Sequence, residues 1–382
     1  MIQQGALHGI RVVDLSRMLP GPYCSMILAD HGAEVIAVED RKFASDGLFF
    51  NDLNRNKRHM SLNLKTVEGL EIFFKLVEKA DVVIEGFRPG VVQRLGVDYD
   101  AVRKGNPGII YCSISGYGQT GPMRDRVGHD VNYISNAGIL DLVGEKGGAP
   151  VIPGVQIADI AGGTMNAAVG ILLALFAREK TGKGQYIDIS MTDGVLGLLT
   201  LPSFLSQSRG QKQQASDGLL SHRYACYNTY MTADGRYISL GALEGRFWRR
   251  LCEHLHRPQY IPLHYDEQKR DEIIEDFRRI FRAKSMAEWD AELAEMEICF
   301  AVVKNMEEIM TDPHLRQREM VHSYTGENGE VKHGFGIPVK LSETPGSIRT
   351  IPGKFGEHTR EIVAELGYAT EQIEAFLARG VL

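Results

Sequence analysis

The chain has 382 residues, 43% of them hydrophobic, with 43 basic and 49 acidic side chains and a formal net charge of −6. This length is more than one simple core usually serves, so we expect two domains. The slightly acidic balance excludes the strong positive field of a typical nucleic-acid-binding protein, and the hydrophobic content excludes a wholly disordered chain. A small molecule is therefore the expected partner, and no nucleic acid is expected.

The cysteines form no CxxC pair and no zinc-finger spacing, so neither a disulfide framework nor a structural metal is expected. They are Cys24, Cys112, Cys226, Cys252 and Cys299. The chain does not begin with an apolar signal core, and no stretch reaches the ~18 to 20 uncharged apolar residues of a membrane-spanning helix. The longest apolar segment, residues 167–176, is expected to be a buried helix. A cytoplasmic protein with no membrane partner fits these features.

The first half of the chain alternates short β-branched runs with amphipathic segments, separated by Gly or Pro. The expected strands are 11–15, 34–38, 60–64, 82–84, 109–114 and 186–190. The expected helices are 23–30, 67–78, 161–180 and one from about 193, and the second carries Val67, Leu70, Phe74 and Val77 at helical spacing. Strands that alternate with helices in this way predict an α/β fold, with a mostly parallel sheet covered on both faces.

A domain boundary is expected between residues 205 and 221, where the composition shifts to Ser, Gln, Gly and Lys, as in an exposed linker or flap. Beyond it, a hairpin over 224–231 and 237–240 and helices at 246–256, 267–282 and 286–296 indicate a smaller α+β domain. A final amphipathic helix over 356–366 precedes a helical tail. We divide the chain into a large domain (1–205), a linker (206–224), a small domain (225–325) and a C-terminal segment (326–382).

The turn after the first expected strand, LSRMLPGPYC, has no GxGxxG, so nicotinamide or flavin binding is not expected. Its Pro20-Gly21-Pro22, with Arg17 just before, leads into a helix that could receive a phosphate or carboxylate, or the prolines could simply start the helix. Other cations flank expected strands, where an α/β sheet binds ligands, although each alone is more often a solvated surface charge. These are Arg55, Lys57, Arg58, Arg88 and Arg94.

Acid–base chemistry is suggested by His129 and Asp130 in GHDVNYI, by Asp159 in IADIAGG and by Glu244 in GALEGRFW. A serine hydrolase is disfavoured because no GxSxG is present, and a metal site because neither HExxH nor a 2-His-1-carboxylate spacing occurs. Each of these residues could instead make a structural hydrogen bond. Asp159 is the strongest candidate, because it precedes a long helix. It could cap this helix, or it could expose its carboxylate beside the free N–H groups of the helix start.

At these residues the chain resembles, over nearly its whole length, the class III CoA-transferase (CaiB/BaiF) family, which includes the alpha-methylacyl-CoA racemases. The matching stretches are GIRVVDLSRMLPGPYCSMILADHGAEVI, LNRNKRHMSLNLKT, ADVVIEGFRPGVVQRLG, ISGYGQTGP, LALFAREKTGKGQYIDISM and PGKFGEHTREIVAELGY. The resemblance implies a Rossmann-like large domain, to which the C-terminal segment returns, a small α+β domain, and two chains interlocked as a homodimer. It also implies an acyl-CoA thioester substrate, with coenzyme A as part of that substrate and no permanently bound cofactor.

In this family Asp159 resembles either the transferase nucleophile, which forms an aspartyl-CoA anhydride and then a thioester, or the racemase base on the α-carbon. GHDVNYISNAGIL is similar to the racemase segment around its catalytic His, and GALEGRFW to the segment whose Glu supports that His. Leu19 stands where formyl-CoA-type transferases have Gln. The resemblance therefore favours a racemase that uses His129 and Asp159, with a CoA-transferase as the alternative. The alternative in which the protein is not an enzyme is a catalytically silent acyl-CoA-binding protein.

The resemblance also implies a set of CoA-binding residues: Arg88, Arg94, Arg126, Arg17, Leu62 and Phe87. One departure concerns the family pattern V-x-V-E-R, because Val38-Glu39 is followed here by Asp40 and only then by Arg41. Arg41 either replaces that phosphate contact from one residue along, or the contact is absent. The loop over 42–54 is short, and the acyl group is not indicated.

Overall fold

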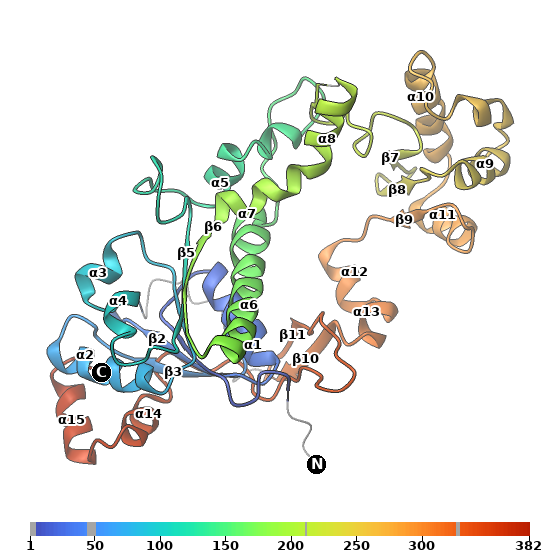
Figure 1. Ribbon diagram of the computed structural model, residues 1–382. Coiled ribbons are helices and arrows are strands. Elements are labelled where there is room, and N and C mark those ends of the chain that lie inside the picture. Colours follow the sequence, from blue (N-terminus) through green and yellow to red (C-terminus); the bar gives the residue numbers. More distant parts are fainter. Residues whose placement is uncertain (1–4, 44–50, 211, 326–328) are drawn as a thin grey trace. The chain divides into compact units, whose positions relative to one another are not determined.

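A computed structural model describes residues 5–43, 51–210, 212–325 and 329–382, and the chain forms two compact units (Figure 1). The larger consists of Met1–Ile139, Pro153–Leu198 and Arg316–Leu382, and the smaller of Leu140–Ile152 and Leu199–Leu315. This division differs from the expected one, which kept 1–205 together and began the C-terminal segment at 326. Residues 140–152 join the smaller unit because long-range contacts hold them there, and local composition does not reveal such contacts.

The larger unit is built on a six-stranded parallel sheet in the order β3-β2-β1-β4-β5-β6, which confirms the expected α/β class. The strands are β1 Arg11–Asp14, β2 Glu34–Glu39, β3 Lys57–Ser61, β4 Val82–Glu85, β5 Ile110–Ser115 and β6 Tyr186–Ser190. Strand order reverses direction at β1, between β2 and β4, and ligands of open α/β sheets bind outside the carboxyl ends at such a point. The sheet topology thus identifies where to look for a site.

Helices cover both faces of this sheet (Figure 1). They are α1 Pro20–Asp30, α2 Val67–Glu78, α3 Val91–Leu95, α4 Tyr99–Val102, α5 Asp130–Asn136, a π-helix η4 Ala158–Met165 that runs into α6 Asn166–Thr181, α7 Met191–Leu196, α14 Thr359–Glu365 and α15 Thr370–Ala378. Short 3-10 turns are η1 Arg41–Phe43, η2 Asn51–Asn54 and η5 Gly197–Leu199. Helices α1 and α6 pack together, whereas α2, α14 and α15 share one core with β1–β5. The C-terminal helices are therefore an integral part of the larger unit.

Two sequence expectations about this unit need correction. Helix α2 has the predicted bounds, but Val67 and Phe74 are exposed, and the buried face is formed by Ile72, Phe73, Leu76 and Val77. Strand β3 begins at Lys57, three residues before the expected start. Lys57 and His59 are buried in this strand because the Pro22 main-chain oxygen and the Glu39 carboxylate receive them, and the hydrophobic pattern cannot indicate such partners.

The continuous helix over Ala158–Thr181 is longer than the expected 161–180 and, by length and composition alone, long and apolar enough to cross a membrane. This differs from the sequence expectation. Core helices of globular proteins share this length and composition. Part of the helix is buried, with Ala167, Ile171 and Ala174 inside the larger unit.

The smaller unit contains a three-stranded antiparallel sheet in the order β7-β8-β9, with β7 Tyr227–Met231, β8 Tyr237–Gly241 and β9 Phe300–Val302. Its helices are η3 Leu140–Leu142, α8 Thr200–Arg209, α9 Gly245–His254, η6 Pro258–Leu263, α10 Arg270–Phe281, α11 Met286–Leu293 and α12 Met306–Thr311. Aromatic residues fill its core, among them Tyr230, Trp248, Phe277, Phe281 and Trp289. Helix α13 Pro313–Gln317 then leads back to the larger unit, where the hairpin β10 Val321–Thr325 and β11 Val331–Phe335 lies.

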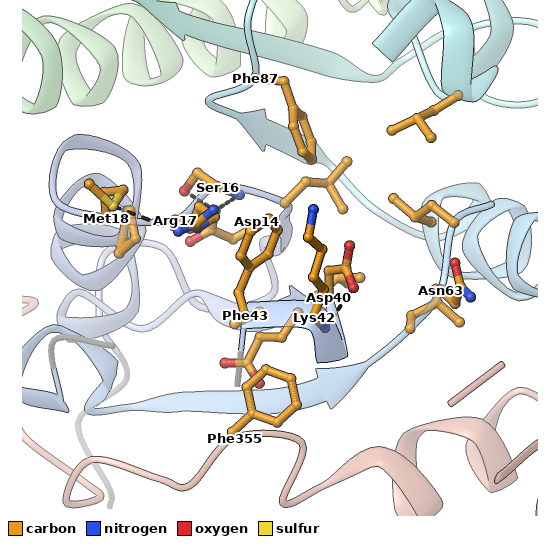
Figure 2. A pocket seen from close by; sticks show the side chains of 18 of the residues that line it. Asp14, Ser16, Arg17, Met18, Asp40, Lys42, Phe43, Asn63, Phe87 and Phe355 are labelled. Atoms are coloured by element: carbon orange, nitrogen blue, oxygen red, sulfur yellow. Dashed lines mark hydrogen bonds between the residues drawn. The ribbon is translucent and has the colours of Figure 1, made fainter. Parts of the chain in front are cut away.

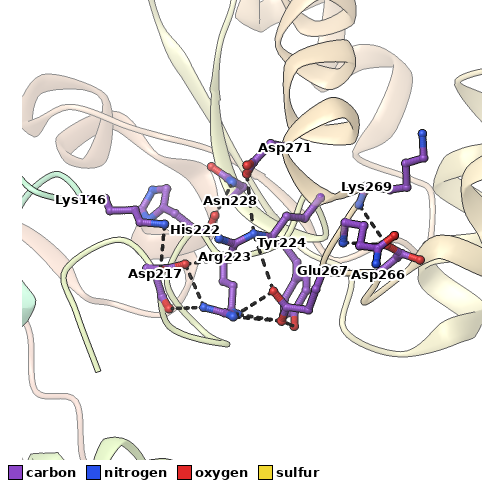
Figure 3. A network of polar contacts seen from close by, with 12 residues as sticks. Lys146, Asp217, His222, Arg223, Tyr224, Asn228, Asp266, Glu267, Lys269 and Asp271 are labelled. Carbon is purple, nitrogen blue, oxygen red and sulfur yellow. Dashed lines mark hydrogen bonds and ion pairs between the residues drawn. The ribbon is translucent and has the colours of Figure 1, made fainter. Parts of the chain in front are cut away.

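Much of the expected linker is an ordered part of the smaller unit (Figure 3). The Asp217 carboxylate accepts hydrogen bonds from Arg223 Nη1 at 3.0 Å and Arg270 Nη1 at 2.8 Å, and it pairs with Lys146 Nζ at 3.0 Å. Ser216 Oγ donates to the main-chain oxygen of Gly144 at 2.7 Å. These contacts fix the 212–224 segment, and they also hold residues 140–152 in the smaller unit.

Candidate active site

A cavity of about 270 Å³ opens at the carboxyl ends of β1, β2, β3 and β4, where the strand order reverses (Figure 2). Its walls are mainly apolar, with Leu62, Phe87 and Leu95 among them, and Figure 2 shows Phe43 and Phe355 lining it as well. Charged residues of both signs also line it: the cations Arg17, Lys42 and Lys65, and the acids Asp14, Glu39 and Asp40. The apolar walls suit a flat ring, and the cations suit anionic groups of the same ligand.

The expected CoA-binding residues divide into two groups. Arg17, Leu62 and Phe87 line this cavity, and the Arg17 guanidinium lies 3.6 Å from the Phe43 ring centroid. The expected phosphate ligands Arg88, Arg94 and Arg126 are not among the residues that line it. They follow β4 and β5, on the next part of the same sheet edge.

Arg41 is not among the residues that line this cavity, and its substitution for the family's strand-end arginine stays a prediction. Its Nη1 donates to the main-chain oxygen of Leu382 at 3.5 Å, and Lys42 lines the cavity instead. Leu382 is buried in the core that α14 and α15 share with the sheet. Of the short loop expected over 42–54, residues 44–50 lie outside the described part of the chain.

The cations of the NRNKRH stretch pair with groups of the protein and do not line the cavity. Arg55 pairs with Asp30 at 2.6 Å, and Arg58 pairs with Glu34, Glu361 and Glu365. Lys57 Nζ donates to the Pro22 main-chain oxygen at 2.7 Å, and burial lowers the pKa of Lys57 to about 8. Lys57 therefore holds the turn between β1 and α1, and all three cations are engaged by groups of the protein. A role for them in binding an anionic ligand stays a prediction.

The structure ties the segments that carry His129 and Asp159 together through Asp130. His129 is the N-cap of α5, and Asp130 is the first residue of that helix. Asp130 Oδ1 accepts hydrogen bonds from the main-chain N–H groups of Ala158 at 2.6 Å and Asp159 at 3.0 Å. The segments of the two candidate acid–base residues, 30 positions apart in the sequence, are thus joined by hydrogen bonds to the Asp130 carboxylate.

Asp159 lies in the first turn of the π-helix η4, partly buried. Burial, reinforced by the neighbouring charge of Asp130 and opposed by His129, raises the pKa of Asp159 to about 6. The expected capping role is wrong, because Asp130 accepts from the N–H groups at this helix start and Ile157 is the N-cap. A carboxyl with a pKa near neutrality can both take and give a proton at physiological pH.

The glycines after Asp159 allow close packing. A Cβ on Gly162 would stand 2.3 Å from the Met191 main-chain oxygen, and one on Gly163 would stand 3.0 Å from Pro20 Cβ. Thr164 Oγ1 donates to the Pro20 oxygen at 2.8 Å. The turn before α1 is thereby held against η4, and π-helical segments of this kind are frequent at functional sites.

Tyr133 is a site residue that the sequence did not single out. Its hydroxyl donates to the Gly128 main-chain oxygen at 2.5 Å, and a Cβ on Gly116 would stand 2.3 Å from its ring. Burial raises the pKa of Tyr133 to about 12, and Asp159 adds to this rise while Arg88 opposes it. The sequence could have indicated Tyr133 through its spacing of three residues from Asp130, which places both on one side of α5.

Glu244 belongs to the smaller unit, where it is the exposed N-cap of α9. Its expected support of His129, which belongs to the larger unit, stays a prediction. Among the described residues, no group of three or more His, Cys, Asp or Glu side chains is arranged to hold a metal ion.

Removal of the Asp130 carboxylate is expected to loosen this site and to lower the pKa of Asp159. Asp130→Ala leaves two main-chain N–H groups without their acceptor, at a cost of about 1–3 kcal/mol in the free energy of unfolding. Asp130→Asn keeps an amide oxygen and should cost less. Both remove a negative charge that raises the pKa of Asp159. Urea unfolding and carboxyl ¹³C NMR titration measure the two effects, and an unchanged Asp159 pKa in both variants would contradict the proposed tie.

Comparison with known proteins agrees with the resemblance seen in the sequence. The family model described as CoA-transferase family III matches residues 7–359. An acyl-CoA transferase from Fusarium pseudograminearum is 35% identical, over 99% of this chain and 89% of its own length, and an alpha-methylacyl-CoA racemase from Mus musculus is 35% identical, over 96% of this chain and 95% of its own. The crystal structure of a CaiB/BaiF family protein from Brucella suis superposes with a TM-score of 0.84 at 29% identity, covering 95% of this chain and 100% of that one. The chain belongs to CoA-transferase family III.

Proposed function

We propose that this protein is an alpha-methylacyl-CoA racemase, which epimerises 2-methylacyl-CoA thioesters through an enolate with His129 and Asp159 as its two acid–base groups. The observation that carries the proposal is that Asp130, next to His129 in the sequence, accepts hydrogen bonds from the main-chain N–H groups of Ala158 and Asp159. The Asp159 carboxyl has a pKa raised to about 6 and is influenced electrostatically by His129. Two different proton carriers at one place suit a reaction that removes a proton on one face of a carbon and returns one on the other.

In the proposed mechanism, Asp159 takes the α-proton of one stereoisomer, and the electron pair of the broken C–H bond moves onto the thioester oxygen as an enolate. Protonated His129 then delivers a proton to the opposite face, which inverts the carbon. The reverse direction exchanges the two roles. Glu244 is proposed, by family resemblance, to support the imidazole.

Three main-chain N–H groups at and beside Asp159 already have acceptors: those of Ala158 and Asp159 donate to Asp130, and that of Ile160 donates to the Gln156 oxygen at 3.1 Å. We propose that the N–H groups of the glycines that follow Asp159 stabilise the enolate oxygen, a large term in enolate chemistry.

Coenzyme A enters this proposal as part of the substrate, with no permanently bound cofactor. Its adenosine part would occupy the cavity lined by Arg17, Leu62 and Phe87. Its phosphates would meet Arg88, Arg94 and Arg126, at the adjoining strand ends. The apolar walls exclude water from the ring, and the arginines pair with the charged groups.

A class III CoA-transferase is the second candidate. It is favoured by the 35% identity to the acyl-CoA transferase, which equals the identity to the racemase. With a pKa of about 6, Asp159 is mainly ionised at pH 7, as a carboxylate nucleophile must be. In this reaction the carboxylate would attack the thioester carbonyl and displace the CoA thiolate.

Incubation with a single stereoisomer of a 2-methylacyl-CoA in D₂O separates the candidates. We expect deuterium to enter the α-position as stereochemical purity is lost, followed by mass spectrometry and chiral chromatography. Transfer of CoA to an added carboxylic acid, with no deuterium in the α-position, would establish the transferase instead. Binding of CoA with neither reaction would indicate the silent binding protein.

We also propose that the protein is a homodimer, interlocked as in its family. Helix α6 carries a row of exposed apolar side chains: Val169, Leu172, Leu173 and Phe176. Such a contiguous apolar face is typical of an interface, and a second copy of the chain would cover it. Light scattering coupled to size exclusion tests this, and a monomeric mass would refute it.

We also propose that the protein is located in the reducing environment of the cytoplasm. The five cysteines all lie in the described part of the chain, where each is free and Cys299 alone is exposed. Buried unpaired thiols are ordinary in reducing compartments.

A further inference from the structure

A cavity of about 530 Å³ opens at the amino ends of β1, β2 and β3, on the edge of the sheet opposite to the candidate active site. Arg11 and Glu34 are the first residues of β1 and β2, and Arg58 is the second residue of β3. Two further charged residues come from separate segments: Lys79 is the C-cap of α2, and Arg349 lies in the C-terminal segment. All of these residues belong to the larger unit.

The charges that line this cavity are mostly positive. Four cations line it, Arg11, Arg58, Lys79 and Arg349, whereas Glu34 is the one acid among the described lining residues. Glu34 is shared between two of them, because its carboxylate accepts from Arg11 Nε at 2.9 Å and from Arg58 Nη1 at 3.2 Å. Arg58 also pairs with exposed acids of α14, which do not line the cavity.

The protein supplies fewer partners than these cations can use. Lys79 and Arg349 have no acidic partner among the residues that the structure describes. Asp81, two residues after Lys79, is already paired with Arg178 at 2.7 Å. Arg58 Nε is a further donor without a hydrogen-bond partner among the described atoms. Both positive charge and hydrogen-bonding capacity are thus left over at this cavity.

The fold holds Arg349 in place although its side chain is exposed. Asn56 Oδ1, from a buried side chain, accepts hydrogen bonds from the main-chain N–H groups of Arg349 at 2.6 Å and Thr350 at 3.0 Å. Arg349 Nη2 donates to the Ala29 main-chain oxygen, in the last turn of α1, at 2.8 Å. A guanidinium has five N–H donors, so this contact positions the cation and leaves most of its donors for a ligand.

Several cations around one cavity, with donors left unsatisfied, favour a multivalent anion. The oxygens of a phosphate group form a tetrahedron and can accept from donors on separate segments of the chain, and guanidinium groups bind them well. The described lining has no aromatic ring other than the His8 imidazole, and Gly9, Gly32 and Ala33 form part of the wall. The cavity therefore suits the phosphate groups of a small molecule and has no apolar surface that would select a base.

We propose that this cavity binds a small phosphate-bearing anion, with Lys79 and Arg349 as its main ligands. The site is separate from the one proposed for coenzyme A, which opens at the carboxyl ends of the same strands. It does not rest on the proposed function, because its residues take no part in the acid–base chemistry.

The alternative is a purely structural role, in which Lys79 and Arg349 only complement the negative C-terminal ends of α2 and α1. Isothermal titration with inorganic pyrophosphate, at constant ionic strength, separates the two. We expect Lys79→Gln and Arg349→Gln each to raise the Kd about tenfold, through the loss of one charge-assisted contact. Lys79→Arg keeps the charge and should bind within about twofold of the wild type. A purely structural role predicts an unchanged Kd for every variant.

Lys104→Gln is the matched control, because Lys104 is exposed, has no ion pair within the described ranges and lies outside the cavity. Its Kd should equal that of the wild type. Pyrophosphate at ten times the Kd should also raise the Tm of the wild type by about 2 °C, and that of Lys79→Gln by less. Circular dichroism of each variant without the anion checks that it is folded.

The titration is repeated with excess CoA, because pyrophosphate could also enter the site proposed for CoA. An unchanged Kd supports two separate sites, and loss of pyrophosphate binding would place the anion in the CoA site and overturn the proposal. An equal rise in Kd for Lys104→Gln would show only general attraction of anions to the surface. A wild-type protein that binds no pyrophosphate would refute the site and leave the proposed function standing.

Discussion

Replacement of Asp159 by Ala is expected to slow epimerisation of a 2-methylacyl-CoA by ~10²-fold or more, the usual scale for a positioned acid or base. The variant lacks the group that removes the α-proton from one stereoisomer. The other stereoisomer can still lose its proton to His129, so slow deuterium wash-in should persist from that side only. Chiral chromatography and mass spectrometry, applied to each pure stereoisomer in D₂O, measure both effects.

His129→Ala gives the mirror result in the racemase, with wash-in retained from the opposite stereoisomer and epimerisation lost. In a transferase, by contrast, Asp159→Ala would abolish CoA transfer while His129→Ala would leave it. Asp290→Ala, on the exposed side of α11, is the control for loss of an aspartate and should have no effect. If either Asp159→Ala or His129→Ala epimerised at the wild-type rate, the two-base mechanism would be wrong.

Arg55→Ala is expected to lower the free energy of unfolding by about 3–5 kcal/mol, the cost of breaking a buried ion pair on one side. The Arg55 side chain is 6% exposed and that of its partner Asp30 is 3% exposed. Two hydrogen bonds join them, at 2.6 and 3.1 Å, and Arg55 also donates to the Phe335 main-chain oxygen. The variant would leave the Asp30 carboxylate buried without its cation and would release β11 from this contact.

Urea denaturation followed by far-UV circular dichroism measures this change. Tryptophan fluorescence would report on the smaller unit, where Trp248 and Trp289 both lie, and the Arg55–Asp30 pair is in the larger unit. Arg360→Ala is the matched control, since Arg360 forms an exposed ion pair with Glu374 and should contribute no more than about 1 kcal/mol. Equal effects of the two substitutions would contradict a special role for the buried pair.

Local sequence patterns were sufficient for most of the secondary structure. The expected 67–78 helix and 186–190 strand have the observed bounds of α2 and β6, because apolar periodicity and Gly or Pro boundaries act within a few residues. The buried face of α2 was predicted less well. Which side of a helix meets the core depends on where the sheet lies, and spacing alone fits more than one face.

The sequence determined the α/β class, the family and the identity of the candidate catalytic residues, since each rests on residue types in chain order. Tertiary structure alone decided which partners those residues have. Asp130 reaches Asp159 across 29 positions, and Arg55 reaches Asp30 across 25. A residue's type gives its possible partners, but burial and neighbouring charge select the partner and set the pKa. These arise only when distant segments pack together, so Arg55, which the sequence placed among the possible ligand residues, became half of a buried ion pair.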